Sequence, residues 1–162
     1  MSEQDMMNEQ PRRDTLHGVG VSPGRVIAPL VHMAPAVSEP PEDEALEGDA
    51  ETATDRLKAA ALAVKAGLKE RAARARSESA AEVLKATALM AGDKALVKNA
   101  SKLVTEQRLS PERALWQAAT AYADQMRAMG GYMAERAADI EDVRARIVAE
   151  LRGEDAPGVP QR

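Results

Sequence analysis

The sequence predicts an all-α protein, an antiparallel four-helix bundle, preceded by a short pair of β-strands. Of the 162 residues, 44% are hydrophobic, but only 2% are aromatic and none is Phe. Apolar residues recur every three or four positions through most of the chain after Pro41, which indicates amphipathic helices. An alanine-rich core with so few aromatic residues is typical of closely packed helices rather than of a β-sandwich.

The N-terminal region has a different pattern. Residues 1–15 are polar and are expected to be disordered. Residues 16–33 read LHGVGVSPGRVIAPLVHM, with apolar residues around a turn at Ser22-Pro23-Gly24, and this predicts two short strands. An isolated hairpin is marginally stable, so these strands are expected to need a larger sheet. Residues 34–44 are rich in Pro and acidic residues and predict a linker; residues up to 40 are expected to be loose or only partly ordered.

The helical unit is predicted to span residues 45–152. Its first helix runs from Ala45 to about Arg76 along a near-heptad stripe of Leu, Val and Ala. The second helix is expected to begin at a capping box, Ser79 to Glu82. It is broken near Gly92, after which Asp93 caps a further helix.

Two more helices complete the predicted bundle. The segment LSPER places Ser110 at an N-cap and Pro111 at the first helical position. Gly130-Gly131 separates this helix from the last one, which Gly153 ends. Residues 153–162 predict a tail or linker.

Composition excludes several functional classes. A net charge of −4 disfavours a nucleic-acid surface, and the absence of Cys excludes disulfides, zinc thiolates and a thiol nucleophile. The first thirteen residues lack the apolar stretch of a signal peptide. No run approaches the roughly 20 apolar residues that span a bilayer. We therefore expect a soluble, cytoplasmic protein with no membrane or nucleic-acid partner.

The residues alone predict no catalytic or metal site. His17 and His32 lie at the two ends of the strand segment, without a Ser, Cys or carboxylate arrangement beside them, and are interpreted as ordinary strand-flanking histidines. The segment GVGVSPG has neither the spacing of a dinucleotide fingerprint nor the Lys of a P-loop, so a β-turn is the better interpretation.

The predicted second helix is apolar on two faces, whereas a helix on the outside of a small bundle needs only one. One stripe comprises Val83, Ala86, Thr87 and Met90, and the other comprises Leu84, Ala88 and Ala91. Either one stripe meets the core and the other a partner, or both are core. Periodicity does not decide between these two hypotheses.

Several segments, in order along the chain, resemble the N-terminal part of Enzyme I of the sugar phosphotransferase system. They are GVGVSPGRVIAPL, the long helix that follows, VLKATALMAGDKAL and AERAADIEDVRARI, which together cover about residues 16–152. The Ser-Pro-Gly turn is a weak signal by itself, and the segment ERAADIEDV is the most specific one.

The resemblance implies a function. Enzyme I takes a phosphoryl group from phosphoenolpyruvate onto a histidine and passes it to the phosphocarrier protein HPr. Residues 16–33 would then begin an α/β subdomain whose other strands lie beyond Arg162. The inserted helical subdomain, residues 45–152, would dock HPr.

The resemblance also implies that this chain does not catalyse the transfer. The family's phosphorylated histidine lies in a Gly-Gly-x-x-Ser-His-type motif, whereas Gly130-Gly131 is followed here by Tyr-Met-Ala-Glu. Phosphoenolpyruvate and Mg²⁺ are bound in a barrel domain outside this chain, so no cofactor is expected here. The fragment is expected to be monomeric, and the full-length protein a homodimer through its C-terminal domain.

The matching motifs place an HPr-binding surface on specific positions. These are Val83, Ala86, Thr87, Met90, Asp93, Leu96 and Arg136. Where the family reads Glu-Ala-His, this chain has Lys85-Ala86-Thr87. Because HPr presents basic groups near its active histidine, Lys85 is expected to weaken the electrostatic complementarity.

Two other interpretations remain open from the sequence. The first is a stand-alone helical adaptor or dimerisation module that pairs through the Leu46–Leu68 stripe. The second is a membrane or nucleic-acid surface formed by the locally basic segment Lys65–Arg76, which the net charge disfavours.

Overall fold

The computed structural model describes residues 35–158, together with Val19, Pro23, Gly24 and Ile27. The predicted disordered N-terminus and strand pair, residues 1–33, lie outside the described residues apart from those four positions. The last four residues of the predicted tail lie outside them as well.

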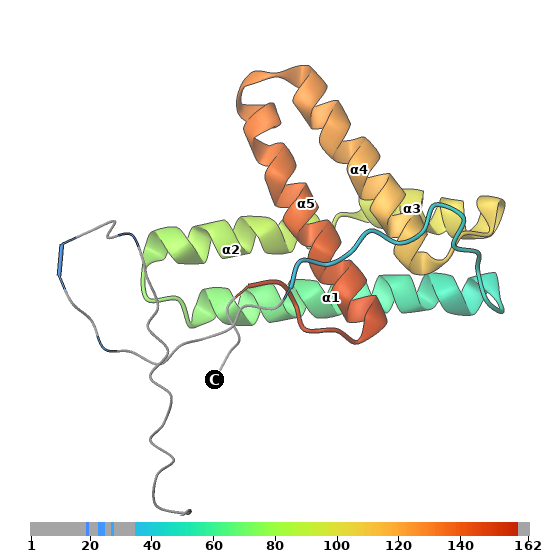
Figure 1. Ribbon diagram of the computed structural model, residues 1–162, viewed down its shortest axis with the longest axis horizontal. Coiled ribbons are helices and arrows are strands. Elements are labelled where there is room, and N and C mark those ends of the chain that lie inside the picture. The colour runs from blue at the N-terminus through green and yellow to red at the C-terminus, as the bar shows by residue number, and fades with distance from the viewer. Residues whose placement is uncertain (1–18, 20–22, 25–26, 28–34, 159–162) are drawn as a thin grey trace, which may run out of the picture. The chain divides into compact units, whose positions relative to one another are not determined.

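The described part of the chain is all-α, as predicted. It contains five helices, α1 (Ala50–Ala73), α2 (Glu78–Ala91), α3 (Lys94–Gln107), α4 (Pro111–Met129) and α5 (Gly131–Arg152) (Figure 1). The second and third of these are the two parts of the rod that was predicted to break near Gly92. No helix of the described segment has the length and apolar character needed to cross a membrane.

Short polar side chains and glycines set most helix ends, as predicted. The Asp93 carboxylate accepts hydrogen bonds from the backbone N–H groups of Ala95 (2.6 Å) and Leu96 (3.1 Å). Ser110 accepts one from the Arg113 N–H at 3.0 Å, and Pro111 follows it as the first helical residue. Gly153, with φ 68°, ends α5 in the left-handed conformation.

Two predicted helix starts are wrong. The first helix begins at Ala50 rather than Ala45, because the Thr52 N–H donates to the Asp49 carboxylate at 2.8 Å and makes Asp49 the N-cap. The second helix begins at Glu78, and its cap is Ser77 rather than Ser79: the Ala80 N–H donates to Ser77 Oγ at 3.3 Å. In both cases several polar residues near the start could serve as caps, and the pattern alone does not choose between them.

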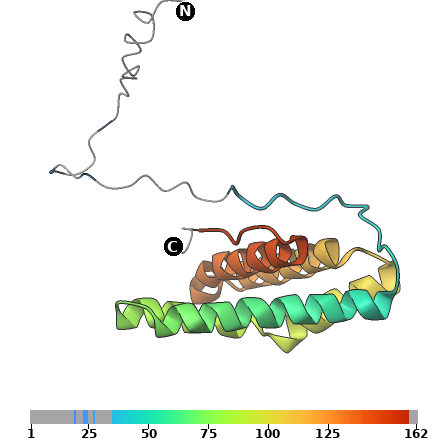
Figure 2. The same ribbon diagram turned by 90° about the horizontal axis from the view of Figure 1, so that it is seen from below.

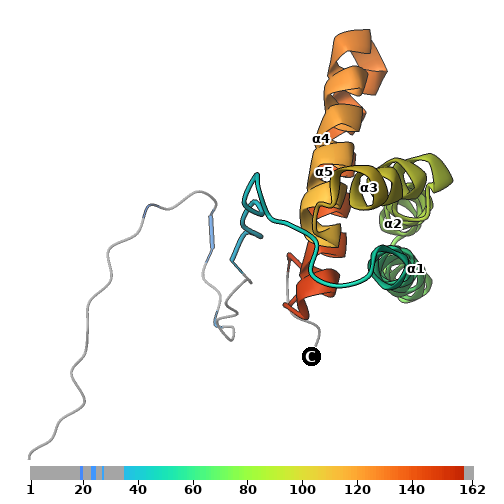
Figure 3. The ribbon, with the colours of Figure 1, turned by 90° about the vertical axis from the view of Figure 1, so that its right-hand side faces the viewer.

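The helices form two antiparallel pairs that cross each other. The row of α2 and α3 runs antiparallel to α1, and α4 runs antiparallel to α5 (Figure 1). Seen from below, the second pair lies in a separate layer over the first (Figure 2), and the side view shows the same crossing (Figure 3). The four rods therefore do not share one bundle axis. The helix α1 packs against all four others.

The core is built from aliphatic side chains and alanines, as the composition predicted. Its largest fully buried side chains include Leu57, Leu115, Ile140 and Ile147. Between them lie completely or almost completely buried alanines from every helix, among them Ala61, Ala91, Ala100, Ala119, Ala123 and Ala137. Such small residues allow two helix backbones to approach each other closely.

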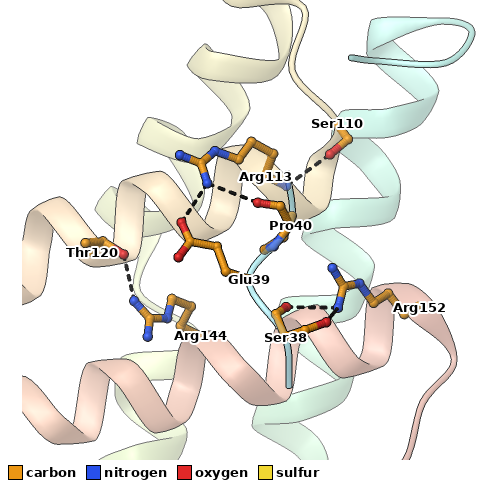
Figure 4. A network of polar contacts seen from close by, with 8 residues as sticks. All are labelled: Ser38, Glu39, Pro40, Ser110, Arg113, Thr120, Arg144 and Arg152. Carbon is orange, nitrogen blue, oxygen red and sulfur yellow. Dashed lines mark hydrogen bonds and ion pairs between the residues drawn. The ribbon is translucent and has the colours of Figure 1, made fainter. Parts of the chain in front are cut away.

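An arginine joins α4 to α5 within this core region. The Arg144 guanidinium lies 3.8 Å from the centre of the Trp116 ring. Its Nη1 donates to Thr120 Oγ1 at 2.7 Å (Figure 4). Burial lowers the pKa of Arg144 below its ordinary value, chiefly because the charged form loses hydration. The stacked ring offsets part of that loss through a cation–π interaction.

Residues 35–46, which we call the strap, have no helix but are fixed to the helices. Arg113 Nη1 donates to Glu39 Oε1 at 2.8 Å and to the Pro40 carbonyl at 3.1 Å. Arg152 Nη1 donates to the Ser38 carbonyl at 3.0 Å, and Pro40 is buried (Figure 4). The expectation of a loose segment up to residue 40 is therefore wrong for 38–40.

The other end of the strap is held by backbone hydrogen bonds. The Leu46 N–H donates to the Arg108 carbonyl at 2.6 Å, and the Ser110 N–H donates to the Glu44 carbonyl at 2.9 Å. Ala45 and Leu109 thus form an isolated antiparallel bridge. This pairing fixes the chain just before α1 against the loop between α3 and α4.

We expect the substitution Leu57→Ala to lower the free energy of unfolding by about 2–5 kcal/mol. Leu57 is fully buried on the helix that contacts all the others. Leu62→Ala is the matched control, because Leu62 is on the same helix and 62% exposed; its expected effect is within about 0.5 kcal/mol. Urea unfolding followed by circular dichroism measures both, and equal losses would contradict this core.

The N-cap of α1 should make stability depend on pH. Hydrogen bonds from the backbone N–H and the hydroxyl of Thr52 lower the pKa of Asp49 below its ordinary value of 3.8. Ionised Asp49 therefore stabilises the fold above pH 3.8, and this stabilisation is lost as the pH falls through the lowered pKa.

We expect Asp49→Ala to reduce the melting temperature at neutral pH, and the difference from the unchanged chain to shrink in strong acid. Asp49→Asn is the control, since it keeps an acceptor oxygen but does not titrate. Thermal melts over a pH series measure the effect. A difference between the unchanged chain and Asp49→Ala that is constant with pH would contradict the assigned role.

Candidate protein-docking surface

The helix α2 has one face in the core and another in solvent. Ala88 and Ala91 are buried, and Leu84 packs against the same cluster. On the opposite side Val83 is 56% exposed and Leu89 is 67% exposed. The stripe of Leu84, Ala88 and Ala91 is therefore the core stripe, and α2 keeps a second apolar surface without a partner among the described residues.

We call this second surface the outer face of α2. It consists of Val83, Ala86, Leu89 and Met90. Ala86 lies three residues after Val83, three before Leu89 and four before Met90, so all four share one side of the helix. Ala86 and Met90 are half-buried, and Met90 also packs against the core cluster, so it lies at the border of this face. Three of the predicted site residues thus lie together here.

Thr87 belongs to the predicted set but lies on the core side. It is 8% exposed, and its hydroxyl donates to the Val83 carbonyl at 3.0 Å. This hydrogen bond satisfies the hydroxyl within the helix, as is usual for buried Thr in helices. Thr87 was predicted in one stripe with Val83 and Ala86, but in the structure it lies on the core side of the helix.

Gly92 ends α2 at the break, with an ordinary backbone conformation (φ −96°). The Lys65 side chain crosses the break: a Cβ placed on Gly92 would lie 2.5 Å from its Cδ and 2.7 Å from its Nζ, and this flexible end would have to move for a larger residue. Asp93 is half-buried and engaged as the N-cap of α3. Its carboxylate thus stabilises the start of α3, whether or not a partner contacts it.

Leu96 lies in the core and also lines a groove between α3 and α4. It is 2% exposed. The groove has a volume of about 450 Å³ and a mixed lining that includes Leu103, Tyr122, Asn99, Lys102 and Gln125. Leu96 therefore forms part of a concave surface, with its side chain covered by neighbours.

Arg136 lies in the second turn of α5 and is held by two side chains of the same helix. Its Nε donates to the Tyr132 hydroxyl at 2.8 Å, and its Nη1 donates to Asp139 Oδ2 at 2.7 Å. These hydrogen bonds raise the pKa of Arg136 above its ordinary value, and the one to Asp139 has the larger effect. The Arg136 side chain keeps 31% of its surface exposed.

The turn between α4 and α5 carries a further exposed apolar surface. Met129 is 70% exposed, Tyr132 65% and Met133 37%. Gly130 and Gly131, with φ of 71° and 53°, make this turn in a conformation that side chains disfavour. Arg136 thus lies one helical turn from exposed methionine and tyrosine side chains.

The structure brings part of the predicted set together. Val83, Ala86 and Met90 share the outer face of α2, whereas Thr87 and Leu96 are buried. Leu89, the most exposed large apolar residue of α2, was not among the predicted site residues. Its spacing from Ala86 was the signal that could have identified it.

The dimerisation hypothesis based on the Leu46–Leu68 stripe is not supported. Leu57 is completely buried and Leu68 is 3% exposed, both within the core of their own chain. At the end of α1, Arg74 pairs with Glu70 at 2.6 Å, as expected of a solvated helix end.

The described residues contain no cluster of three or more side chains that could hold a metal ion. Both histidines of the chain, His17 and His32, lie outside the described residues. The described residues offer an apolar helix face, a groove and an arginine held by its neighbours.

Comparison with known proteins agrees with the resemblance. A phosphoenolpyruvate-protein phosphotransferase of Streptomyces coelicolor is 43% identical over 146 residues, which cover 90% of this chain and 26% of that protein. The protein of the same name from Geobacillus stearothermophilus is 31% identical over 154 residues, 91% of this chain and 26% of that protein. The chain thus spans about a quarter of the length of these curated relatives.

A solved structure shares the fold. The NMR solution structure of an Enzyme I protein matches 76% of this chain and 48% of its own chain, with a TM-score of 0.60 and 20% identity. A family model described as "PEP-utilising enzyme, N-terminal" matches residues 17–136, well over half of the chain. The chain therefore belongs to the PEP-utilising enzyme family, whose N-terminal region it matches.

Proposed function

We propose that residues 45–152 are the HPr-docking unit of an Enzyme I, a phosphoenolpyruvate-protein phosphotransferase. The name of the curated relatives supports the enzyme family. The observation that carries the docking role is the outer face of α2, where Val83 and Leu89 stay exposed although the helix already buries its other face.

Such a surface favours a protein partner. An exposed apolar helix face is unfavourable in water and gains free energy when a partner covers it. Met side chains adapt to the shape of a partner, and the groove between α3 and α4, whose lining begins at Ala95 just after the break, adds a concave surface. Together they offer a partner both an apolar contact and a recess.

The net charge of the chain, rather than the charges beside the outer face, favours a partner with basic groups. The chain has a net charge of −4, and Glu82 is exposed beside this face. The exposed Lys85 opposes the trend, so complementarity is reduced at that position. The apolar contact is then the main source of affinity, and charge mainly sets the rate of association.

We further propose that phosphoryl transfer chemistry is carried by parts of the enzyme other than this unit. Neither histidine of this sequence lies in a Gly-Gly-x-x-Ser-His-type motif. In Enzyme I the phosphorylated histidine and the site for phosphoenolpyruvate and Mg²⁺ belong to other parts of the protein. By this proposal, the 162-residue chain binds HPr and is a monomer, whereas the full-length enzyme is a homodimer.

The docking proposal is tested by titrating the isotope-labelled chain with the HPr of its own organism. We expect amide shift changes clustered on residues 83–96 and around Arg136. Leu89→Ala should weaken binding by about 5- to 30-fold, as for a central interface residue. Leu62→Ala is the matched control, because Leu62 is similarly exposed on α1 (62%, against 67% for Leu89).

Two results would contradict docking at this surface. One is the absence of shift changes at high HPr concentration. The other is an equal loss of affinity from Leu89→Ala and Leu62→Ala, since that would show that the outer face of α2 has no special role.

A phosphorylation experiment tests the proposal that this unit is not catalytic. The chain is incubated with phosphoenolpyruvate and Mg²⁺, and phosphohistidine is sought by phosphorus NMR and mass spectrometry. We expect none, whereas the full-length relative of Streptomyces coelicolor should be labelled under the same conditions. Labelling of His17 or His32 would show that the chain is itself a phosphoryl acceptor.

A further inference from the structure

Arg136 is held in place before any partner binds. Its Nε donates to the Tyr132 hydroxyl and one N–H of Nη1 donates to Asp139. The guanidinium carbon also lies 5.2 Å from the centre of the Tyr132 ring. No hydrogen bond among the described residues uses Nη2, and we call the two N–H donors of this nitrogen the free edge of the guanidinium.

The Arg136 side chain is accessible. The Arg136 side chain is 31% exposed, and Tyr132 is 65% exposed. A free surface arginine loses rotamer entropy when a partner immobilises it, and this loss weakens binding. Tyr132, four residues before Arg136, and Asp139, three residues after it, restrict the side chain already in the unbound protein.

The other arginine pairs of α5 lack this arrangement. Arg127 of α4 pairs with Glu141 at 2.7 Å and with Asp124 at 2.9 Å, and Arg146 pairs with Asp142 at 2.7 Å. These pairs contain only carboxylates and no aromatic ring, although Arg127 also lies beside the exposed apolar turn, where its carbonyl accepts from the Gly130 N–H. Arg136 combines an aromatic support, a carboxylate and an exposed apolar neighbour in Met133.

We propose that Tyr132 is a positioning residue, which together with Asp139 presents the free edge of Arg136 to an oxyanion of the phosphocarrier partner. The N–H donors of Nη2 suit an oxygen of a carboxylate or of a phosphoryl group. This inference rests on the proposed function. It adds how the arginine is oriented and which chemical group of the partner it engages.

A double-mutant cycle with HPr tests the positioning role. Tyr132→Phe keeps the ring but removes the hydroxyl, and we expect it to weaken binding about fivefold, the size of one hydrogen bond. Arg136→Gln should weaken binding at least as much. Adding Tyr132→Phe to Arg136→Gln should cause no further loss, because Tyr132 acts through Arg136.

A spectroscopic measurement separates positioning from a merely structural effect. The Nε–H signal of Arg136 in the unbound chain should exchange with water faster in Tyr132→Phe, with an unchanged melting temperature. Asp139→Asn should have a similar effect on this signal and on affinity. Asp142→Asn is the matched control, since it removes an arginine partner from the same helix away from the proposed contact.

Titration with unphosphorylated and phosphorylated HPr identifies the oxyanion. A loss in Tyr132→Phe with both forms would assign a carboxylate of the partner, and a loss with the phosphorylated form alone would assign the phosphoryl group. Either result supports the proposal.

Three results would overturn the proposal. The first is unchanged affinity of Tyr132→Phe for both forms of HPr, while the unchanged chain binds; the docking function would then stand without the positioning role. The second is an equal loss from Tyr132→Phe with and without Arg136→Gln, which would make Tyr132 a direct contact. The third is no binding of HPr by the unchanged chain, which would overturn the proposed function as well.

Discussion

Close packing around α1 is the constraint on which the rest of the helical unit depends. All four other helices contact α1, and such an arrangement requires small residues where the backbones approach. Ala60, Ala61 and Ala72 on α1 meet this requirement, while Leu57 and Leu68 fill the remaining space. Because the core-facing residues of α1 are already buried within one chain, the unit needs no second copy to cover its core.

The break at Gly92 and Asp93 gives α2 and α3 different packing partners. The Lys65 side chain crosses Gly92, and Asp93 begins a new helix with its own hydrogen bonds. As a result α2 packs against α1 and α5, whereas α3 packs against α1 and α4. This division leaves the outer face of α2 exposed and places a groove beside α3.

The proposed docking surface therefore combines two kinds of contact. The outer face of α2 supplies adaptable apolar area, and Arg136 supplies a directed charge whose orientation depends on Tyr132 and Asp139. Such a combination gives specificity through the arginine and affinity through the apolar face. The strap is outside this surface and stabilises the opposite part of α4 and α5 through Arg113 and Arg152.

The sequence by itself determined the helical class, the family resemblance and the helix ends at Asp93, Ser110, Gly130 and Gly153, because caps and glycine turns are interactions between near neighbours in the chain. It did not determine that Thr87 is buried and Leu89 exposed. Which stripe of α2 meets the core depends on how α1 and α5 lie against it, and that is a property of the tertiary structure. The crossing of the helix pairs and the fixing of the strap by Arg113 likewise arise from residues distant in sequence, whose contacts no local pattern contains.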